Sequence, residues 1–162
     1  MNIFYLDHQP HLAAQYHCDK HCSRMILETA QLLSTAHREL DSSRADLVYK
    51  STHKNHPSSI WVRQSRKNYS WLWELFYQLN EEFRFRRGKD HASFAKLGEI
   101  LAYAPDDIPP TEFTEPPQCM PDEYKVEGDS VQAYRNYYLG AKSAFAAWNW
   151  GRPAPEWYYA QV

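Results

Sequence analysis

The sequence is poor in several features that would place it in a common class of protein. Its 162 residues include only three cysteines and five glycines, which argues against a disulfide-rich secreted scaffold and against a collagen-like or linker protein. No apolar run approaches the roughly 20 residues that cross a bilayer, and the N-terminus lacks the basic start and long apolar stretch of a signal peptide. We therefore expect a cytoplasmic protein that makes no contact with a membrane.

Familiar catalytic signatures are missing as well. There is no GxGxxG turn, no P-loop, no GxSxG elbow and no CxxC pair. Kinase, nicotinamide-dependent dehydrogenase and serine hydrolase functions therefore lose their usual support, and we expect no cofactor.

Apolar and aromatic residues, in contrast, are abundant. The chain holds six Trp, twelve Tyr and seven Phe, and 43% of its residues are hydrophobic, which is enough to form one core in a chain of this length. Spacings of three and four predict helices over residues 11–38, 57–87, 94–104 and 130–148. Six of the ten prolines fall between residues 105 and 121, which predicts an extended strap. We expect residues 1–162 to form a single compact all-α domain of three to four helices with long irregular connections.

The net charge of -2 is unevenly distributed. Residues 1–96 carry 14 Lys and Arg against 10 Asp and Glu, whereas residues 97–162 carry 4 against 10. All eight histidines also lie in the first part. A phosphate-bearing partner, either DNA or a nucleotide, is therefore expected to bind the N-terminal two-thirds. The excess is modest, and it is also typical of proteins with no role in nucleic-acid binding.

A stripe of polar side chains follows the first predicted helix. At about 100° per residue, five side chains share one face beside the apolar arc: His17, His21, Arg24, Glu28 and Gln31. Histidines, an arginine and a carboxylate that converge there could exchange protons or bind an anion. The structural alternative is a hydrogen-bonded polar seam with an ordinary Arg24–Glu28 pair.

The same helix offers weaker support for a metal site. His17 and His21, like Cys18 and Cys22, have the four-residue spacing of two ligands on a helix. The cysteines are expected on the apolar arc and the histidines on the stripe, so the four cannot readily face one ion. A site with histidine and carboxylate ligands stays open, but we assign no metal ligand.

A basic loop precedes the second predicted helix. It contains Lys50, His53, Lys54, Asn55 and His56. Free N–H groups and the dipole at a helix start favour anions, and Arg63 extends the positive charge along the helix. The loop therefore predicts a phosphate site, with a solvated basic face as the alternative.

Two stretches resemble the pyrimidine-dimer DNA glycosylase superfamily, of the endonuclease V type. One is the charged first helix over residues 19–33, and the other is Asn55-His56-Pro57 followed by Trp61 and Tyr69. The closing segment over residues 134–157 is also similar. The resemblance covers most of the chain at low identity.

The whole chain also resembles an uncharacterised family from tailed-bacteriophage genomes. Its members open much as this chain does, through His17-Cys18-Asp19-Lys20-His21. A phage-encoded protein would act in the cytoplasm of the host cell.

The glycosylase resemblance implies an all-α enzyme that flips a nucleotide out of the duplex and attacks its sugar with the N-terminal amine. Asn2 is expected to leave Met1 in place, so that Met1 carries this amine. A gap-free match to the phage glycosylases places Ser23 at the position of the assisting acid, whereas a match to the bacterial branch places Glu28 there. We take Glu28, Met1 and His21 as the catalytic candidates. The candidates for binding substrate or phosphate are His17, Lys20, Arg24, Gln31, Lys50, His53, Lys54, Asn55, His56 and Arg63.

Three functions are compatible with these residues. The first is a DNA N-glycosylase/lyase that acts on a damaged or modified base. The second is a non-catalytic phage protein that binds and sequesters a small phosphorylated nucleotide, and the third is a structural or interaction protein. The modest charge favours a small ligand, whereas the resemblance favours DNA. The sequence does not indicate the oligomeric state.

Overall fold

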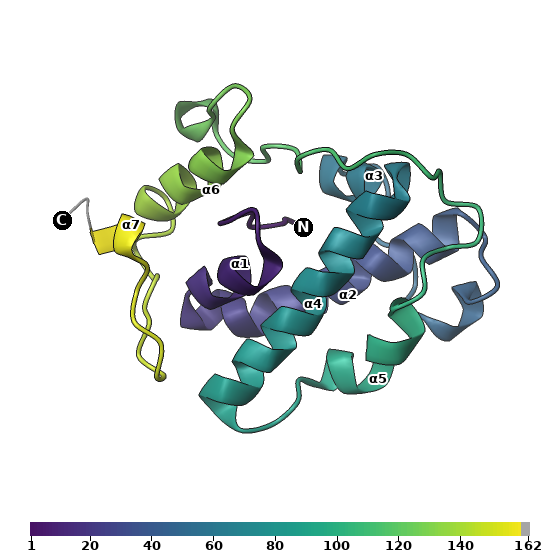
Figure 1. Ribbon diagram of the computed structural model, residues 1–162, viewed down its shortest axis with the longest axis horizontal. Coiled ribbons are helices and arrows are strands. Elements are labelled where there is room, and N and C mark those ends of the chain that lie inside the picture. The colour runs from purple at the N-terminus through teal and green to yellow at the C-terminus, as the bar shows by residue number, and fades with distance from the viewer. Residues whose placement is uncertain (160–162) are drawn as a thin grey trace.

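The computed structural model describes residues 1–159, which form seven α-helices and two short 3-10 helices with no strand among them (Figure 1). The α-helices are α1 (Pro10–Tyr16), α2 (Asp19–Glu39), α3 (Pro57–Gln64), α4 (Arg66–Arg87), α5 (Ala92–Leu101), α6 (Ser130–Leu139) and α7 (Glu156–Tyr159). The 3-10 helices are Ala45–Leu47 and Asp122–Tyr124. The all-α prediction is confirmed, but the helices are more numerous than the three to four expected. None of the helices in the described part of the chain is long and apolar enough to cross a membrane.

Two of the predicted helices are each divided in two. The helix predicted over residues 11–38 breaks at His17 and Cys18, whose backbones are extended. The helix predicted over residues 57–87 breaks at Ser65, whose hydroxyl accepts hydrogen bonds from the first N–H groups of α4. Neither break contains a proline or a glycine, which are the strongest stop signals in a sequence.

The last predicted helix is shorter than expected. Helix α6 ends at Leu139, before Gly140, and not near Trp148. A Cβ atom on Gly140 would lie 2.3 Å from the ring of Tyr124, so no side chain fits there. The residues that follow leave the helix axis and reach α2, where the carbonyl of Ala147 accepts a hydrogen bond from the N–H of Asp19.

Helix α4 lies at the centre of the molecule. It packs against α1, α2, α3 and α5, and Figure 1 shows it crossing α2. Its buried apolar side chains are Tyr69, Leu72, Leu75, Phe76, Leu79 and Phe83. Gly88 ends the helix with a φ of 76°, a left-handed conformation that glycine adopts without strain.

The first residues of the chain run through the core as an extended segment. Ile3, Phe4, Tyr5 and Leu6 are all buried. The side chain of Asn2 donates a hydrogen bond to the carbonyl of Cys119 and accepts one from the hydroxyl of Tyr134. These two contacts, from the strap and from α6, hold the N-terminus against α2.

Residues 105–121 form the extended strap that the prolines predict. In Figure 1 the strap passes from α5 across α3 to α6. The indole of Trp61 donates to the carbonyl of Thr114 at 2.9 Å, and the N–H of Thr114 donates to Oδ1 of Asn68 at 2.9 Å. Because the strap is bonded to α3 and α4 in this way, it belongs to the same body as the helices.

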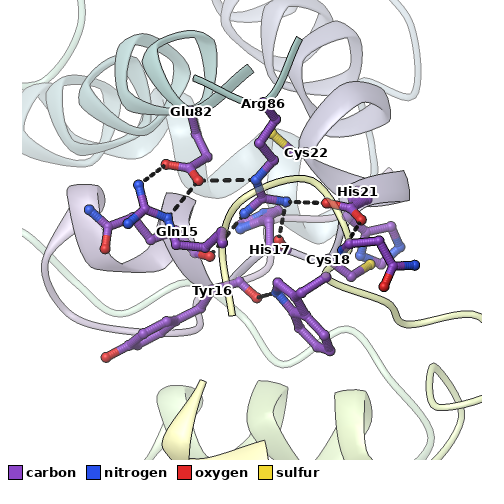
Figure 2. Close-up of polar contacts among 12 residues, drawn as sticks. Gln15, Tyr16, His17, Cys18, His21, Cys22, Glu82 and Arg86 are labelled. Atoms are coloured by element: carbon purple, nitrogen blue, oxygen red, sulfur yellow. Dashed lines mark hydrogen bonds and ion pairs between the residues drawn. The ribbon is translucent and has the colours of Figure 1, made fainter. Parts of the chain in front are cut away.

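A buried ionic cluster joins α1, α2, α4 and the C-terminal segment (Figure 2). The side chain of Arg86 is only 1% exposed, and its guanidinium lies 3.0 Å from Glu82 Oε1 and 3.1 Å from Asp19 Oδ1. It also donates to the carbonyls of Gln15 and His17 at 3.0 and 2.9 Å. Arg86 thereby satisfies carbonyls that the end of α1 leaves without helical partners.

We expect removal of the Arg86 charge to destabilise the fold strongly. Arg86→Met leaves Glu82 buried with one cation fewer and leaves the two carbonyls unpaired. We expect the free energy of unfolding to fall by an amount on the order of 3–5 kcal/mol. Arg84→Met is the matched control, because Arg84 pairs with Glu81 and Asp90 on the exposed side of the same helix and should cost less than about 1 kcal/mol. Urea unfolding followed by circular dichroism measures both. Equal stabilities of the two variants would contradict this role of Arg86.

Candidate functional site

The structure brings the N-terminal amine to the predicted catalytic carboxylate. The nitrogen of Met1 lies 3.5 Å from Oε1 of Glu28, and Nε of Arg24 lies 3.0 Å from Oε2 of the same side chain. The side chain of Glu28 is 15% exposed, whereas that of Arg24 is 67% exposed. The carboxylate is thus held between two positive groups, one at the edge of the core and one facing solvent.

The Met1–Glu28 pair lies in the wall of a cavity of about 400 Å³, which we call the amine cavity. Its volume is within the range of small-molecule sites. Its lining residues are Met1, Asn2, Phe4, Lys20, His21, Arg24, Met25, Glu28, Tyr137, Lys142 and Phe145. The ammonium of Lys142 lies 4.7 Å from the ring centre of Tyr137, and that of Lys20 lies 4.6 Å from the ring centre of Phe145. The cavity therefore combines cations for an anionic group with flat rings for a planar one.

Two further cavities, each of about 510 Å³, continue the amine cavity along α2. The first shares Met1, Arg24 and Glu28 with it and reaches Gln31 and His53. The second shares Lys20, Arg24 and Phe145 with it and is lined by Arg87 and Trp150 at its other end. Because the three cavities share lining residues, they are neighbours along α2, and together we call them the α2 furrow.

His21 lines the amine cavity as a neutral imidazole. The centre of its ring lies 4.3 Å from the ring centre of Phe4, with the two rings tilted by 30°. Its Nδ1 lies 2.7 Å from the hydroxyl of Tyr138. Burial, helped by the charge of His17 and Lys142, lowers the pKa of His21 to about 3. Near neutral pH His21 can exchange hydrogen bonds with a ligand, but it cannot hold a phosphate by its charge.

His17 does not reach the α2 furrow, and the expectation that one helix carries His17 and His21 on a common stripe is wrong. Helix α1 ends at Tyr16, so His17 lies in the break before α2. Its side chain is fully buried, with Nδ1 2.6 Å from the carbonyl of Ala13. Burial lowers its pKa to about 4. The four remaining members of the stripe line the furrow: His21, Arg24, Glu28 and Gln31.

Most of the basic loop before α3 lies outside the furrow. Only His53 lines it, at the end nearest Gln31. Lys54 pairs with Glu39 at 3.8 Å, and Arg63 donates a hydrogen bond to Ser59. Lys50 and Asn55 are exposed.

The start of α3 has fewer free N–H groups than the sequence suggests. Pro57 has no N–H, and the N–H of Ser58 donates to Nδ1 of His56 at 3.1 Å. His56 is therefore the cap of this helix. Burial and the nearby positive N-terminus lower its pKa, which further weakens it as a cationic ligand for phosphate.

Within residues 1–159 no group of three or more His, Cys, Asp or Glu side chains is arranged to hold a metal ion. Cys18 and Cys22 are buried free thiols. Burial raises the pKa of Cys22 to about 12, so its sulfur is a protonated thiol near neutral pH.

The sequence analysis missed part of the furrow wall. Phe4, Tyr137 and Lys142 line the amine cavity. Arg87 and Trp150 line the cavity at the outer end of the furrow. These residues come from four separate segments, so no local spacing connects them. The one local signal was the mixture of aromatic and basic residues after Tyr134.

Comparison of the chain with protein-family models, with curated proteins and with solved structures finds no match. The resemblance to DNA glycosylases therefore stays an expectation. The chemistry of the α2 furrow has to be argued from its own geometry.

We predict that acid destabilises the protein well above the range in which carboxylates titrate. Burial lowers the pKa of His17 and His37 to about 4 and that of His21 to about 3, from an ordinary 6.5. At a pH between the ordinary pKa and the lowered one, the histidine binds a proton in the unfolded chain but not in the folded chain. The free energy of unfolding therefore falls as the pH falls. Melting temperatures between pH 7 and pH 5 should decrease steadily. A constant melting temperature over this range would contradict the burial of neutral histidines.

Proposed function

We propose that the protein is a DNA N-glycosylase/lyase that acts on a damaged or modified base. The observation that carries the proposal is the 3.5 Å contact between the Met1 amine and Glu28 in the wall of a cavity that also presents Lys20 and Lys142. An amine can form an imine with a sugar, and a carboxylate beside it can act as the base that activates it.

In the proposed reaction the unprotonated nitrogen of Met1 attacks C1′ of the sugar. The bond between C1′ and the base breaks, and its electron pair leaves with the base, which takes up a proton. The ring oxygen then leaves C1′ with its electron pair and takes up a proton, which produces an imine between C1′ and the Met1 nitrogen. Loss of a C2′ proton expels the 3′ phosphate by β-elimination. Glu28 stabilises the positive charge that develops on the sugar and accepts the proton released by the amine.

The other walls of the amine cavity fit a nucleotide that has left the base stack. Lys20 and Lys142 have no carboxylate partner among residues 1–159, so their charges are available for phosphate groups. Tyr137 and Phe145, whose rings lie beside Lys142 and Lys20, form an aromatic wall against which a base can pack. His21, held by Tyr138, provides a neutral hydrogen-bonding group next to them.

A second candidate is a non-catalytic protein that binds a small phosphorylated nucleotide. The size of the amine cavity, about 400 Å³, favours it, because this volume suits one nucleotide. In that case the Met1–Glu28 contact would serve only to fix the N-terminus.

Borohydride trapping tests the catalytic proposal. The wild-type protein is incubated with a duplex oligonucleotide that holds one abasic aldehyde site, and cyanoborohydride or borohydride reduces any imine. Intact mass and peptide mapping should find one adduct on the amine of Met1. Glu28→Gln should slow its formation by roughly 100-fold or more, the scale of a lost electrostatic group, with little change in melting temperature.

Two controls belong to this experiment. Glu39→Gln removes a carboxylate at the other end of α2, outside the furrow, and should trap at the wild-type rate. A chain extended by two residues before Met1 moves the amine away from Glu28 and should lose the adduct. An unchanged rate of adduct formation in folded Glu28→Gln would show that Glu28 does not assist the reaction. An adduct on a lysine would show that Met1 is not the nucleophile.

Binding of the same oligonucleotide should depend steeply on salt, because phosphate contacts release counterions. Lys142→Gln should weaken binding and reduce the dependence on salt. The slope of log affinity against log salt concentration should fall by about one unit, which corresponds to one lost phosphate contact. Lys54→Gln should have a smaller effect, because Lys54 pairs with Glu39 outside the furrow. Affinity that stays flat between low and moderate salt would exclude DNA and favour the small-nucleotide candidate.

A further inference from the structure

The outer end of the α2 furrow is a second candidate site that the proposed reaction does not use. It is a cavity of about 510 Å³ between the start of α2, the end of α4 and the segment before α7. Its polar and aromatic lining includes Lys20, Arg24, Arg87, Phe145, Asn149 and Trp150. We call this cavity the Trp150 subsite.

Arg87 and Trp150 form its distal wall as a stacked pair. The guanidinium carbon of Arg87 lies 3.4 Å from the ring centre of Trp150, the shortest cation–π distance among the described residues. Arg87 has no carboxylate partner within residues 1–159, and Trp150 is 40% exposed. The stacking holds the guanidinium in place and leaves its N–H groups without an anion.

The segment that carries Trp150 is fixed to the body by hydrogen bonds and an ion pair. The N–H of Asn149 donates to Oδ2 of Asp19 at 2.7 Å, and the N–H of Asp19 donates to the carbonyl of Ala147 at 2.8 Å. Arg152 bonds Glu82 at 2.9 Å, which ties the same segment to the ionic cluster around Arg86 in Figure 2. The carboxylate of Asp19 is thus already occupied, and the subsite is formed before a ligand arrives.

The chemistry of the subsite fits a phosphodiester with a base attached. Lys20, Arg24 and Arg87 supply positive charge, while Trp150 and Phe145 supply rings. Alternating cations and aromatic faces along a groove are the features by which proteins bind a single nucleic-acid strand. An acidic peptide would use the cations but carries no planar base joined to its charged group.

The Trp150 subsite and the amine cavity share Lys20, Arg24 and Phe145. A ligand in one is therefore adjacent to a ligand in the other, with positive charge at their junction. We infer that the Trp150 subsite binds the nucleotide next to the one in the amine cavity, on the same strand. Its phosphate lies between Lys20 and Arg87, and its base stacks at Trp150. This inference rests on the proposed function, and it adds the neighbouring nucleotide of the strand to what the protein binds.

The length dependence of binding tests this inference. Equilibrium affinities are measured for a 5′-phosphorylated abasic mononucleotide analogue and for the same analogue within oligonucleotides of two, three and six residues. The wild-type affinity should rise about tenfold or more once a neighbouring nucleotide is present, the scale of one base stacked on an aromatic ring. In Trp150→Ala and in Arg87→Gln the ratio between oligonucleotide and mononucleotide affinity should fall toward one.

Tyr103→Ala is the matched control. Tyr103 is an exposed aromatic residue on which Arg44 stacks at 4.4 Å, but it lies outside the furrow, and its removal should leave the ratio unchanged. Circular dichroism checks that each variant is folded. Equal affinities of the wild-type protein for the mononucleotide and the oligonucleotides would overturn the inference. A ratio of oligonucleotide to mononucleotide affinity in Trp150→Ala that equals the wild-type ratio would overturn it as well. If either of these results occurs but an adduct still forms at Met1, the inference fails and the proposed function stands. If the protein neither forms the adduct nor binds nucleotides, the proposed function and the inference both fail.

Discussion

The buried guanidinium of Arg86 is the interaction on which the rest of the structure depends. It bonds the carbonyls at the end of α1, the carboxylate at the start of α2 and Glu82 on its own helix. The chain can therefore turn between α1 and α2 with these backbone carbonyls hydrogen-bonded. Through Glu82, the same cluster also holds Arg152. Arg86 thereby links the end of α1, the start of α2 and, through Glu82, the C-terminal segment.

The α2 furrow is a consequence of that arrangement. Helix α2 presents Arg24 and Glu28 to one side, and the extended N-terminal segment, anchored by Asn2, brings the Met1 amine to the same side. Because α6 ends before Gly140, the following turn can place Lys142 opposite α2. In the amine cavity the result is one half-buried carboxylate, Glu28, among several cations, a charge pattern that favours an anionic ligand.

Local signals in the sequence predicted much of the fold but only part of the site. Apolar spacing identified the helical segments, and the prolines identified the strap, because both depend on neighbouring residues. The break at His17 and Cys18 escaped prediction because Arg86, which stabilises it, lies far along the chain. His17 was therefore placed on the wrong face. Glu28, Arg24 and His21 were expected together because they share one uninterrupted helix, whereas Lys142 and Trp150 reach the furrow only through tertiary packing.

A structure of the borohydride-trapped complex with an abasic oligonucleotide would test the account most directly. It should show continuous density between the Met1 nitrogen and C1′ of the sugar, with a carboxylate oxygen of Glu28 within hydrogen-bonding distance of that junction. The next nucleotide of the strand should lie against Trp150 and Arg87. A covalent bond to a lysine side chain, or a strand bound away from α2, would contradict the account.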